Sequence, residues 1–600
     1  MLKPLRLPAL LAAIAACMFF VNLGATHLWD VDEAIFSQAA KEMYLRGDLV
    51  TPYFNGQVFP DKPAMMYWLM ISAYEVFGTT EFAARFWSAV FGIGSVLLTY
   101  RLGRLAFSPS VAFWSGLILA TSLNFNIIAR AATPDAFLTF FCTLAMLLFV
   151  AATAKARPQS GQGNERNAPW AGQTRFEPSW WGWCTVYAAM GAAVLTKGPI
   201  GVVLPTASIG LFLLVVRAHH APTVEGTGWK VALVNLGRWL AGVLAPLHVL
   251  RTIWSMRPLT ALAMVLLVAG PWYALVGMAT DGEWLAGFFG VHNFGRFAHA
   301  MDDHSGPIFY YLIAIAIGFF PWSVFASPTL LQMRTQVREG HPWRPGYALA
   351  GSWIAVWVGF FSLAGTKLPS YIIPAYPALA LLTACFVAQW IHEPAAVPRL
   401  FTRLAWGCVA LVGVGLVIAL PIAAHLVLED EWFLGALGAI PLAAAIVGWI
   451  YSERQQARRS AWTMAAAGAA MWIAMLGFLA PYVDRYQDGP AFAERIAADT
   501  AGRPAAVKAF RHFRPSHVYY TDTTVEKIDS PEQVGEFFAA HPADAFVITN
   551  EGQFKKLHGQ LPADVVVLES RRQIGQDEHV LLLGRDRADV ASRPSPGESR

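Results

Sequence analysis

Residues 28–64 read LWDVDEAIFSQAAKEMYLRGDLVTPYFNGQVFPDKPA, a polar loop that directly follows the first apolar segment of the chain. Nine charged side chains crowd into this loop, although only 14% of the chain is charged: Asp30, Asp32, Glu33, Lys41, Glu42, Arg46, Asp48, Asp61 and Lys62. Ile35, Ala39 and Met43 share one face of a short amphipathic helix predicted between the DVDE and DKP runs. Such a helix returns the carboxylates of both runs to one place at a membrane surface, where we expect chemistry.

The composition is that of a polytopic membrane protein. Of the 600 residues, 56% are hydrophobic and 13% aromatic, and the mean hydropathy is +0.44, which lies far outside the range of soluble globular proteins. A net charge of +4 is too small to indicate a nucleic-acid partner. The five cysteines lie in apolar segments without the spacing of metal ligands, so we interpret them as core residues.

Thirteen apolar runs are long enough to cross a bilayer, which takes about 20 helical residues. They lie near residues 7–25, 81–105, 110–130, 134–154, 180–196, 198–217, 258–280, 308–330, 346–364, 370–391, 402–426, 433–451 and 460–480. Only Lys197, Gly198 and Pro199 separate the fifth run from the sixth. The sequence thus predicts an α-helical polytopic membrane domain.

Lysine and arginine collect in alternate loops, which predicts the orientation of the spans. With the N-terminus in the cytoplasm, the basic loops at 155–175, 217–257, 334–344 and 454–459 all lie on that side. The DVDE loop and the C-terminus then lie outside the cytoplasm. We expect the first apolar run to remain as an anchor, because no small-x-small cleavage site precedes the DVDE run. Residues 239–253 are expected to form an interfacial helix on the cytoplasmic face.

The composition changes after Pro481, where the chain becomes mixed and charged. Strand-like runs lie at 518–521, 545–549, 565–569 and 580–584, and a helical pattern covers 531–540. We therefore divide the chain into a membrane domain, residues 1–483, with a catalytic outer loop at 26–80, and a small extracytoplasmic α/β domain, residues 484–600. This second domain lacks a cluster of acid, base and metal-ligand residues, so we expect it to have a supporting role. Its tail, from Arg585, is expected to be disordered.

Ionisable residues at the ends of membrane spans are costly to keep there, so they are candidates for function. The outer loops supply Asp32 and Glu33 after the first span, Asp61 and Lys62 before the second, Asp135 at the start of the fourth, Lys197 in LTKGP, His292 and Arg296 in VHNFGRF, and Lys367 in GTKLPSY.

Each of these residues also has a purely structural interpretation. Asp32 and Asp135 suit the first turn of a helix, where a carboxylate caps the backbone. Lys197 and Lys367 suit anchors that reach lipid headgroups. His292 by itself suits an ordinary loop histidine.

Several motifs follow one another in a set order along the chain. They are Asp32-Glu33, Asp61-Lys62-Pro63, Trp68, Asp135 at the start of a span, LTKGP, HNxxRF and KLPSYIIP, residues 367–374. In this order, over about residues 1–480, the chain resembles the bacterial GT-C glycosyltransferases close to the 4-amino-4-deoxy-L-arabinose lipid A transferases and, more distantly, the protein O-mannosyltransferases. Two positions depart from the arabinose transferases: DEAIF replaces DETRY, and Asp61 replaces a glutamate. The resemblance therefore implies the fold and the reaction class, but not the identity of the sugar and the acceptor.

The resemblance implies an integral-membrane enzyme that moves a pentosyl or hexosyl group from a polyprenyl phosphate to lipid A or another envelope glycolipid. It assigns the donor phosphate to Lys62, Lys197, Arg296, Lys367 and Tyr371, since positioned cations stabilise the charge of the leaving phosphate. It places the catalytic carboxylate first at Asp32, second at Asp135, with Glu33 beside them. It also implies that Asp61 and His292 hold a divalent metal, zinc or manganese.

The same resemblance implies a monomer in the bacterial inner membrane, with the active site and the C-terminus in the periplasm. Among glycosyltransferases, an enzyme like the protein O-mannosyltransferases is the alternative. A lipid or sugar transporter or flippase, or a structural scaffold, would also have many spans. The charges cluster at one face and no two halves of the chain match, which favours the enzyme.

Overall fold

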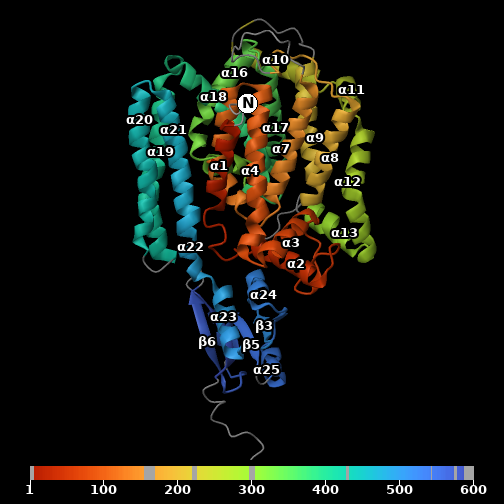
Figure 1. Cartoon of the computed structure of the whole chain (residues 1–600), viewed down its shortest axis with the longest axis vertical. Helices are drawn as coiled ribbons and strands as arrows, with labels where there is room; N and C mark the ends of the chain where they lie inside the picture. Colours follow the sequence, from red (N-terminus) through yellow and green to blue (C-terminus); the bar gives the residue numbers. More distant parts are fainter. Residues whose placement is uncertain are drawn as a thin grey trace, which may run out of the picture.

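The computed structural model describes residues 6–154, 169–218, 226, 228–295, 305–427, 431–541, 544–557, 559–572 and 578–586. Long helices form a bundle, and a small domain built on a β-sheet lies beyond one end of it (Figure 1). The N-terminus lies at the opposite end of the bundle. The predicted fold class, a helical polytopic membrane protein with a small α/β domain, is confirmed.

All thirteen predicted spans overlap helices, but within the described residues fewer than thirteen segments are long and apolar enough to be spans. The helices of the bundle are α1 (Arg6–Phe20), α4 (Glu81–Ala106), α5 (Pro109–Ala120), α6 (Leu123–Ala129), α7 (Asp135–Thr153), α8 (Trp180–Lys197), α9 (Ile200–Arg217), α12 (Pro258–Ala279), α15 (Tyr310–Gly318), α16 (Ala326–Arg338), α17 (Arg344–Leu363), α18 (Tyr376–His392), α19 (Arg399–Val427), α20 (Ala439–Glu453) and α21 (Ala457–Trp472). In the described part of the chain, nine helical segments are long and apolar enough to cross a membrane, or up to twelve if each bent pair is one span. The interfacial helix expected at 239–253 corresponds to α10 (Trp229–Val243) and α11 (Pro246–Ser255), which meet at 48°.

Two of the predicted spans are broken, and their breaks contact each other. The chain bends by 68° between α5 and α6 and by 115° between α15 and α16. At the first break the backbone N–H of Leu123 donates to the carbonyl of Phe320 at 3.1 Å, and the indole of Trp322 donates to Thr121 Oγ1 at 2.8 Å. Each break thus satisfies polar groups of the other, which non-helical backbone at membrane depth requires.

Helix α4 packs closely against its neighbours because small residues face them. A Cβ at Gly103 would lie 2.7 Å from the Cα of Ala112 on α5, and a Cβ at Gly92 would lie 2.8 Å from the Cβ of Ala129 on α6. Small residues at such crossings let helix backbones approach within a membrane. This packing holds α4 against α5 and α6.

The charged loop of residues 28–64 contains the predicted short helix; the DVDE run lies at the start of this helix, and the DKP run lies beyond a hairpin, just before the next helix. The loop contains α2 (Asp32–Arg46) and a hairpin of β1 (Tyr53–Phe54) and β2 (Gln57–Val58), and α3 (Met65–Phe77) follows it. Gly47 ends α2 with φ of 64°, a left-handed conformation that glycine adopts without strain. Helices α2 and α3 lie at the end of the bundle that faces the C-terminal domain (Figure 1).

The C-terminal domain is a five-stranded mixed sheet with helices. Its elements are α23 (Asp488–Thr500), β3 (Ala506–Phe510), α24 (Pro515–Thr521), β4 (Val525–Ile528), α25 (Pro531–Ala540), β5 (Ala545–Asn550), α26 (Glu551–Phe554), β6 (Val565–Arg572) and β7 (His579–Arg585). The strand order is β4-β3-β5-β7-β6; β3 is parallel to β4 and β5, and β7 is antiparallel to β5 and β6. The tail predicted to be disordered lies mostly outside the described residues.

One predicted strand of this domain is wrong. Residues 518–521, read as VYYT, form the second half of helix α24. Pro515 stands at the first turn of this helix, where its fixed φ and missing N–H are tolerated. The side chain of Val518 packs into the core of the domain, and that of Tyr519 packs against α2 and α3. The apolar residues therefore serve two surfaces of a helix, not one face of a sheet.

Candidate active site

A cavity of about 820 Å³ opens where the outer loop meets the end of the bundle. Most of the predicted site residues line it: Asp32, Glu33, Asp61, Lys62, Asp135, Lys197, His292 and Tyr371. They come from α2, the loop before α3, α7, α8, the π-helix η2 (Gly287–Gly295) and the 3₁₀ helix η4 (Pro369–Ala375). Segments far apart in the sequence thus bring their polar side chains to one place, as the loop pattern predicted.

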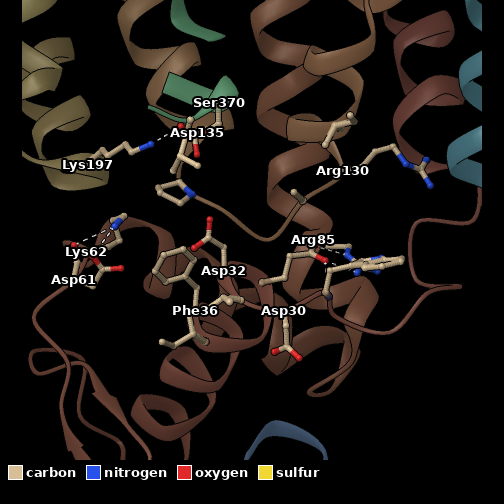
Figure 2. A pocket seen from close by; sticks show the side chains of 18 of the residues that line it. Asp30, Asp32, Phe36, Asp61, Lys62, Arg85, Arg130, Asp135, Lys197 and Ser370 are labelled. Atoms are coloured by element: carbon tan, nitrogen blue, oxygen red, sulfur yellow. Dashed lines mark hydrogen bonds and ion pairs between the residues drawn. The ribbon is translucent and has the colours of Figure 1, made fainter. Parts of the chain in front are cut away.

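Asp32 opens α2 and points into the cavity toward Asp135 (Figure 2). The capping position before it is Val31, and no side chain caps this helix start by a hydrogen bond. Partial burial raises the pKa of the Asp32 carboxyl above its ordinary value, Lys62 opposes this shift, and the nearby charge of Asp135 adds to it. Asp32 is therefore a carboxylate with an accessible surface and a raised proton affinity.

Glu33, the neighbour of Asp32, is held in place by an arginine of α4. Arg85 Nε and Nη2 donate to the two carboxylate oxygens of Glu33 at 2.8 and 2.7 Å. The backbone N–H groups of Trp29 and Ala132 donate to the same carboxylate at 3.0 and 2.8 Å. Burial raises the pKa of Glu33, but the charge and hydrogen bonds of Arg85 outweigh it and hold the pKa below the usual range. Four hydrogen bonds favour a positioning role for Glu33 over the catalytic role predicted for it.

Asp135 and Lys197 form an ion pair on the far wall of the cavity. Lys197 Nζ lies 2.5 Å from Asp135 Oδ1 and 5.0 Å from the centre of the Tyr371 ring. Asp135 is the first residue of α7 and Lys197 is the last of α8, so an acid stands at a positive helix end and a base at a negative one. The pair holds one cation at the cavity wall, beside an aromatic face.

Asp61, Lys62 and His292 form a second cluster of polar side chains in the cavity wall. Lys62 Nζ lies 2.8 Å from Asp61 Oδ1, and His292 Nδ1 lies 3.0 Å from the same oxygen. Asp61 and Lys62 are both nearly buried, and the Lys62 ammonium also lies 5.2 Å from the centre of the Phe36 ring. The described residues hold no group of three or more His, Cys, Asp or Glu that suits a metal ion.

Lys367, which was predicted to bind the donor phosphate, has backbone carbonyls as its partners instead. Lys367 Nζ donates to the carbonyls of Ser362 and Ala364 at 2.9 and 2.8 Å. These carbonyls lie at the C-terminal end of α17, so Lys367 caps a helix end and does not line the cavity. Arg296 lies outside the described residues.

Two arginines at the cavity were missed by the sequence reasoning. Arg85 holds Glu33, and Arg130 donates to the carbonyls of Met18, Phe19 and Val21 at the end of α1, at 2.8 to 3.2 Å. Arg85 falls inside a predicted span and Arg130 at the end of another. A charged side chain is costly to keep in a membrane span, so the positions of Arg85 and Arg130 in the sequence already marked them as candidates.

A smaller, apolar cavity of about 100 Å³ joins the first one at its charged groups. Its apolar lining comes from α9, η2 and the end of α17: Ile200, Phe288, Phe360, Phe361 and Ala364. Its polar lining is shared with the larger cavity: Asp61, Lys62, Lys197, His292, Thr366 and Tyr371. The small apolar cavity thus meets the larger one at two lysines, and further charged side chains stand in the wall of the larger cavity. This arrangement suits an amphiphile with an anionic group.

Comparison with known proteins finds sequence similarity to membrane sugar transferases. Residues 5–237 match the family model of the dolichyl-phosphate-mannose-protein mannosyltransferases (PMT). An uncharacterised protein of Aquifex aeolicus is 30% identical over 376 residues, which are 62% of this chain and 62% of that protein. The undecaprenyl phosphate-α-4-amino-4-deoxy-L-arabinose arabinosyl transferase 1 of Pseudomonas fluorescens is 27% identical over 473 residues, 77% of this chain and 72% of that one.

Among solved structures, the fold matches that of ArnT from Cupriavidus metallidurans. The structure of that protein bound to undecaprenyl phosphate aligns with a TM-score of 0.68 at 20% identity and covers 96% of this chain and 97% of the other. At this identity the likeness concerns the fold. The sequence matches, over residues 5–237 for the PMT family and over 77% of the chain for the arabinosyl transferase, show that the chain is a membrane glycosyltransferase related to the PMT family and homologous to the ArnT aminoarabinose transferases.

Proposed function

We propose that this glycosyltransferase moves a sugar from a polyprenyl-phosphate donor to an acceptor outside the cytoplasm, lipid A or another envelope glycolipid. One observation carries the proposal: a small apolar cavity and a larger cavity with charged side chains in its wall meet at Lys62 and Lys197. A lipid-linked sugar has the same three parts in the same order, namely an apolar chain, a phosphate and a sugar. The relatives named for undecaprenyl-phosphate-linked arabinose support this donor class.

The two cavities suggest where each part of the donor lies. The first isoprene units would lie beside Ile200, Phe288 and Phe360, the phosphate would contact Lys62 and Lys197, and the sugar would enter the larger cavity. A chamber of about 820 Å³ falls within the usual range of small-molecule sites. It leaves room for part of the acceptor beside the sugar.

The reaction breaks the bond between the sugar and the phosphate, which leaves an additional negative charge on the phosphate. Lys62 and Lys197 are placed to stabilise that charge as it develops, and Arg296 is proposed as a third cation. Asp32 faces the chamber with a raised pKa, which suits a general base that takes the proton of an acceptor hydroxyl. For a phosphate acceptor, which carries no such proton, Asp32 would orient the acceptor instead.

Asp61 and His292 are our proposed ligands for a divalent metal. Their oxygen and nitrogen lie 3.0 Å apart, close enough to contact one ion, and carboxylate with imidazole suits zinc or manganese. Two protein ligands are fewer than most zinc sites have, so water or the donor phosphate would complete the set. A bound ion would add positive charge beside the phosphate. Lys62 and Lys197 would still bind the phosphate, and Asp32 would still act on the acceptor.

We propose the bacterial inner membrane as the location, with the active site in the periplasm. The N-terminus lies at one end of the bundle, and the outer loop and the C-terminal domain lie at the other (Figure 1). The basic loops predict a cytoplasmic N-terminus. Reporter fusions near residue 340 should read as cytoplasmic and fusions near residues 50 and 520 as external. An internal reading at residue 50 would overturn the placement of the site.

A transfer assay tests the function directly. The purified full-length protein is given a polyprenyl phosphate that carries a radiolabelled sugar, with lipid A in one reaction and a peptide rich in serine and threonine in another. We expect label on the lipid and release of unglycosylated polyprenyl phosphate. Label on the peptide alone would replace the lipid acceptor by a protein one. Movement of intact donor across a proteoliposome membrane, without any release, would replace the enzyme by a flippase.

A further inference from the structure

The C-terminal domain contacts the active-site loop through helix α24. The backbone N–H of Ser516 donates to Asp30 Oδ1 at 2.9 Å, and its hydroxyl donates to Asp30 Oδ2 at 2.5 Å. Asp30 lies two residues before Asp32. In Figure 2 the two carboxylates point in opposite directions, that of Asp32 into the cavity and that of Asp30 toward the C-terminal domain.

Other side chains of the same segment reach the same loop. The hydroxyl of Tyr520 accepts a hydrogen bond from the backbone N–H of Leu28 at 2.6 Å and donates one to Glu81 on α4 at 3.1 Å. Asp522 pairs with Lys41 of α2 at 2.9 Å. The domain therefore holds both the chain that enters α2 and the helix itself.

A further contact ties the hairpin of the loop to the sheet. Asn55 donates from its amide to the carbonyl of Val525 at 2.9 Å and accepts from the backbone N–H of Val525 at 2.8 Å. The amide thus satisfies both backbone groups of an edge-strand residue. The domain meets the loop at several separate points, so it cannot pivot about one of them.

Helix α24 is itself fixed within its own domain. The imidazole of His517, which is fully buried, lies 3.2 Å from Asp488 of α23, and Arg514 lies 2.8 Å from the same carboxylate. Behind Ser516 stands Gly489, where a Cβ would lie 3.1 Å from the Ser516 side chain. The hydroxyl of Ser516 is therefore presented from a rigid surface.

We propose that Ser516 is a positioning residue of the transfer reaction, which acts through Asp30 to fix the start of α2 and with it the carboxylate of Asp32. This inference rests on the proposed function of Asp32. Helix α2 starts without a side-chain cap of its own, so the direction of its first residue depends on what holds residues 28–31. A displacement of about 1 Å at a catalytic group can cost about a hundredfold in rate. The C-terminal domain thereby takes part in the geometry of the active site.

A double-mutant cycle in the full-length enzyme tests this coupling. Ser516→Ala and Asp30→Ala should each lower kcat by about tenfold with the donor KM changed by less than about twofold. The double variant should be no slower than Asp30→Ala, because the two residues act through one contact. Additive losses, or a Ser516→Ala enzyme with wild-type kcat, would overturn the proposal. The matched control is Ser530→Ala at the start of α25, which should keep the wild-type kcat.

Hydrogen exchange gives a readout that does not depend on activity. In the Ser516→Ala protein the backbone of residues 28–34 should exchange faster than in the wild type and in the Ser530→Ala control. Unchanged exchange there would overturn the proposal even if turnover fell. A wild-type protein that transfers no sugar would contradict the proposed function, whereas faster exchange in this variant would still show that Ser516 orders the loop.

Discussion

Two adjacent carboxylates, Asp32 and Glu33, have different surroundings. The Glu33 carboxylate pairs with Arg85 and accepts two backbone N–H groups, whereas Asp32 faces the cavity. We expect Glu33→Gln to lower the free energy of unfolding by about 3 to 5 kcal/mol, because it leaves a buried arginine unpaired. Thermal unfolding in detergent measures this, with Asp32→Asn as the control that should unfold near the wild-type temperature. A Glu33→Gln protein as stable as the wild type would contradict the positioning role.

The raised pKa of Asp32 predicts how the rate depends on pH. A general base must be ionised, so kcat/KM should fall as the pH drops through the pKa of Asp32, which lies above the ordinary 3.8. The charge of Asp135 contributes to this upward shift. In Asp135→Asn the acid limb of the residual activity should therefore move to lower pH. A limb that stays in place, or moves to higher pH, would show that another group titrates.

The proposed metal makes a prediction of its own at Asp61 and His292. The purified protein should contain zinc or manganese, and His292→Ala should reduce that content because it removes one of the two ligands. Elemental analysis measures it, and chelation should weaken donor binding in the wild type. Equal metal content and equal donor binding in His292→Ala would make His292 an ordinary loop histidine.

At the scale of single residues, the sequence predicts where charges gather better than it predicts what each one does. Asp32, Asp61, Asp135 and Lys197 share the cavity because acids and bases at the ends of spans gather at one membrane face. The arginine partner of Glu33 lies 52 positions along the chain. No local pattern carries such a pairing, so Glu33 appeared equivalent to its neighbour.

At the level of the helices, Lys367 and Lys62 have different roles: one caps a helix end and the other lines the cavities. Lys367 closes the end of α17, while Lys62 stands where both cavities meet. Lys62→Gln should weaken donor binding by about 10- to 100-fold, as expected for the loss of a charged hydrogen bond to phosphate. Lys367→Gln should leave donor binding near the wild type and lower the unfolding temperature. Titration with a fluorescent polyprenyl phosphate measures both, and equal losses of affinity would contradict this assignment.

Helices α24 and α25 show which elements can be predicted from the sequence and which cannot. The predicted range of α25 is the observed one, because Ser530 and Gln533 form a capping box that marks its start. The run VYYT carries no such signal, and short apolar runs fit a strand or a helix equally well. As a helix, this run packs Val518 into the core of the C-terminal domain and Tyr519 against α2 and α3. These contacts exist only in the tertiary structure.

For the whole molecule, span positions are predictable and span shapes are not. The length and hydropathy of an apolar run are local properties, so all thirteen runs overlap helices. The bends of 68° and 115° depend on hydrogen bonds between two breaks about 200 residues apart, such as that from Trp322 to Thr121. The first bend places α6 beside the cavity, where Ile127 lines the wall. A contact between such distant breaks has no local sequence signal, so this part of the site is seen only in the structure.

We propose that Asp32 activates or orients the acceptor while Lys62 and Lys197 hold the phosphate of the lipid-linked sugar in the cavity. The most direct measurement compares turnover and donor binding of Asp32→Asn with those of the wild type, using the radiolabelled donor. Turnover should fall by about 10² to 10⁴, the usual contribution of a positioned acid or base, while the donor Kd should change by less than about threefold because the phosphate contacts remain. Near-normal turnover in Asp32→Asn would contradict the catalytic role of Asp32 and move the catalytic carboxylate to Asp135.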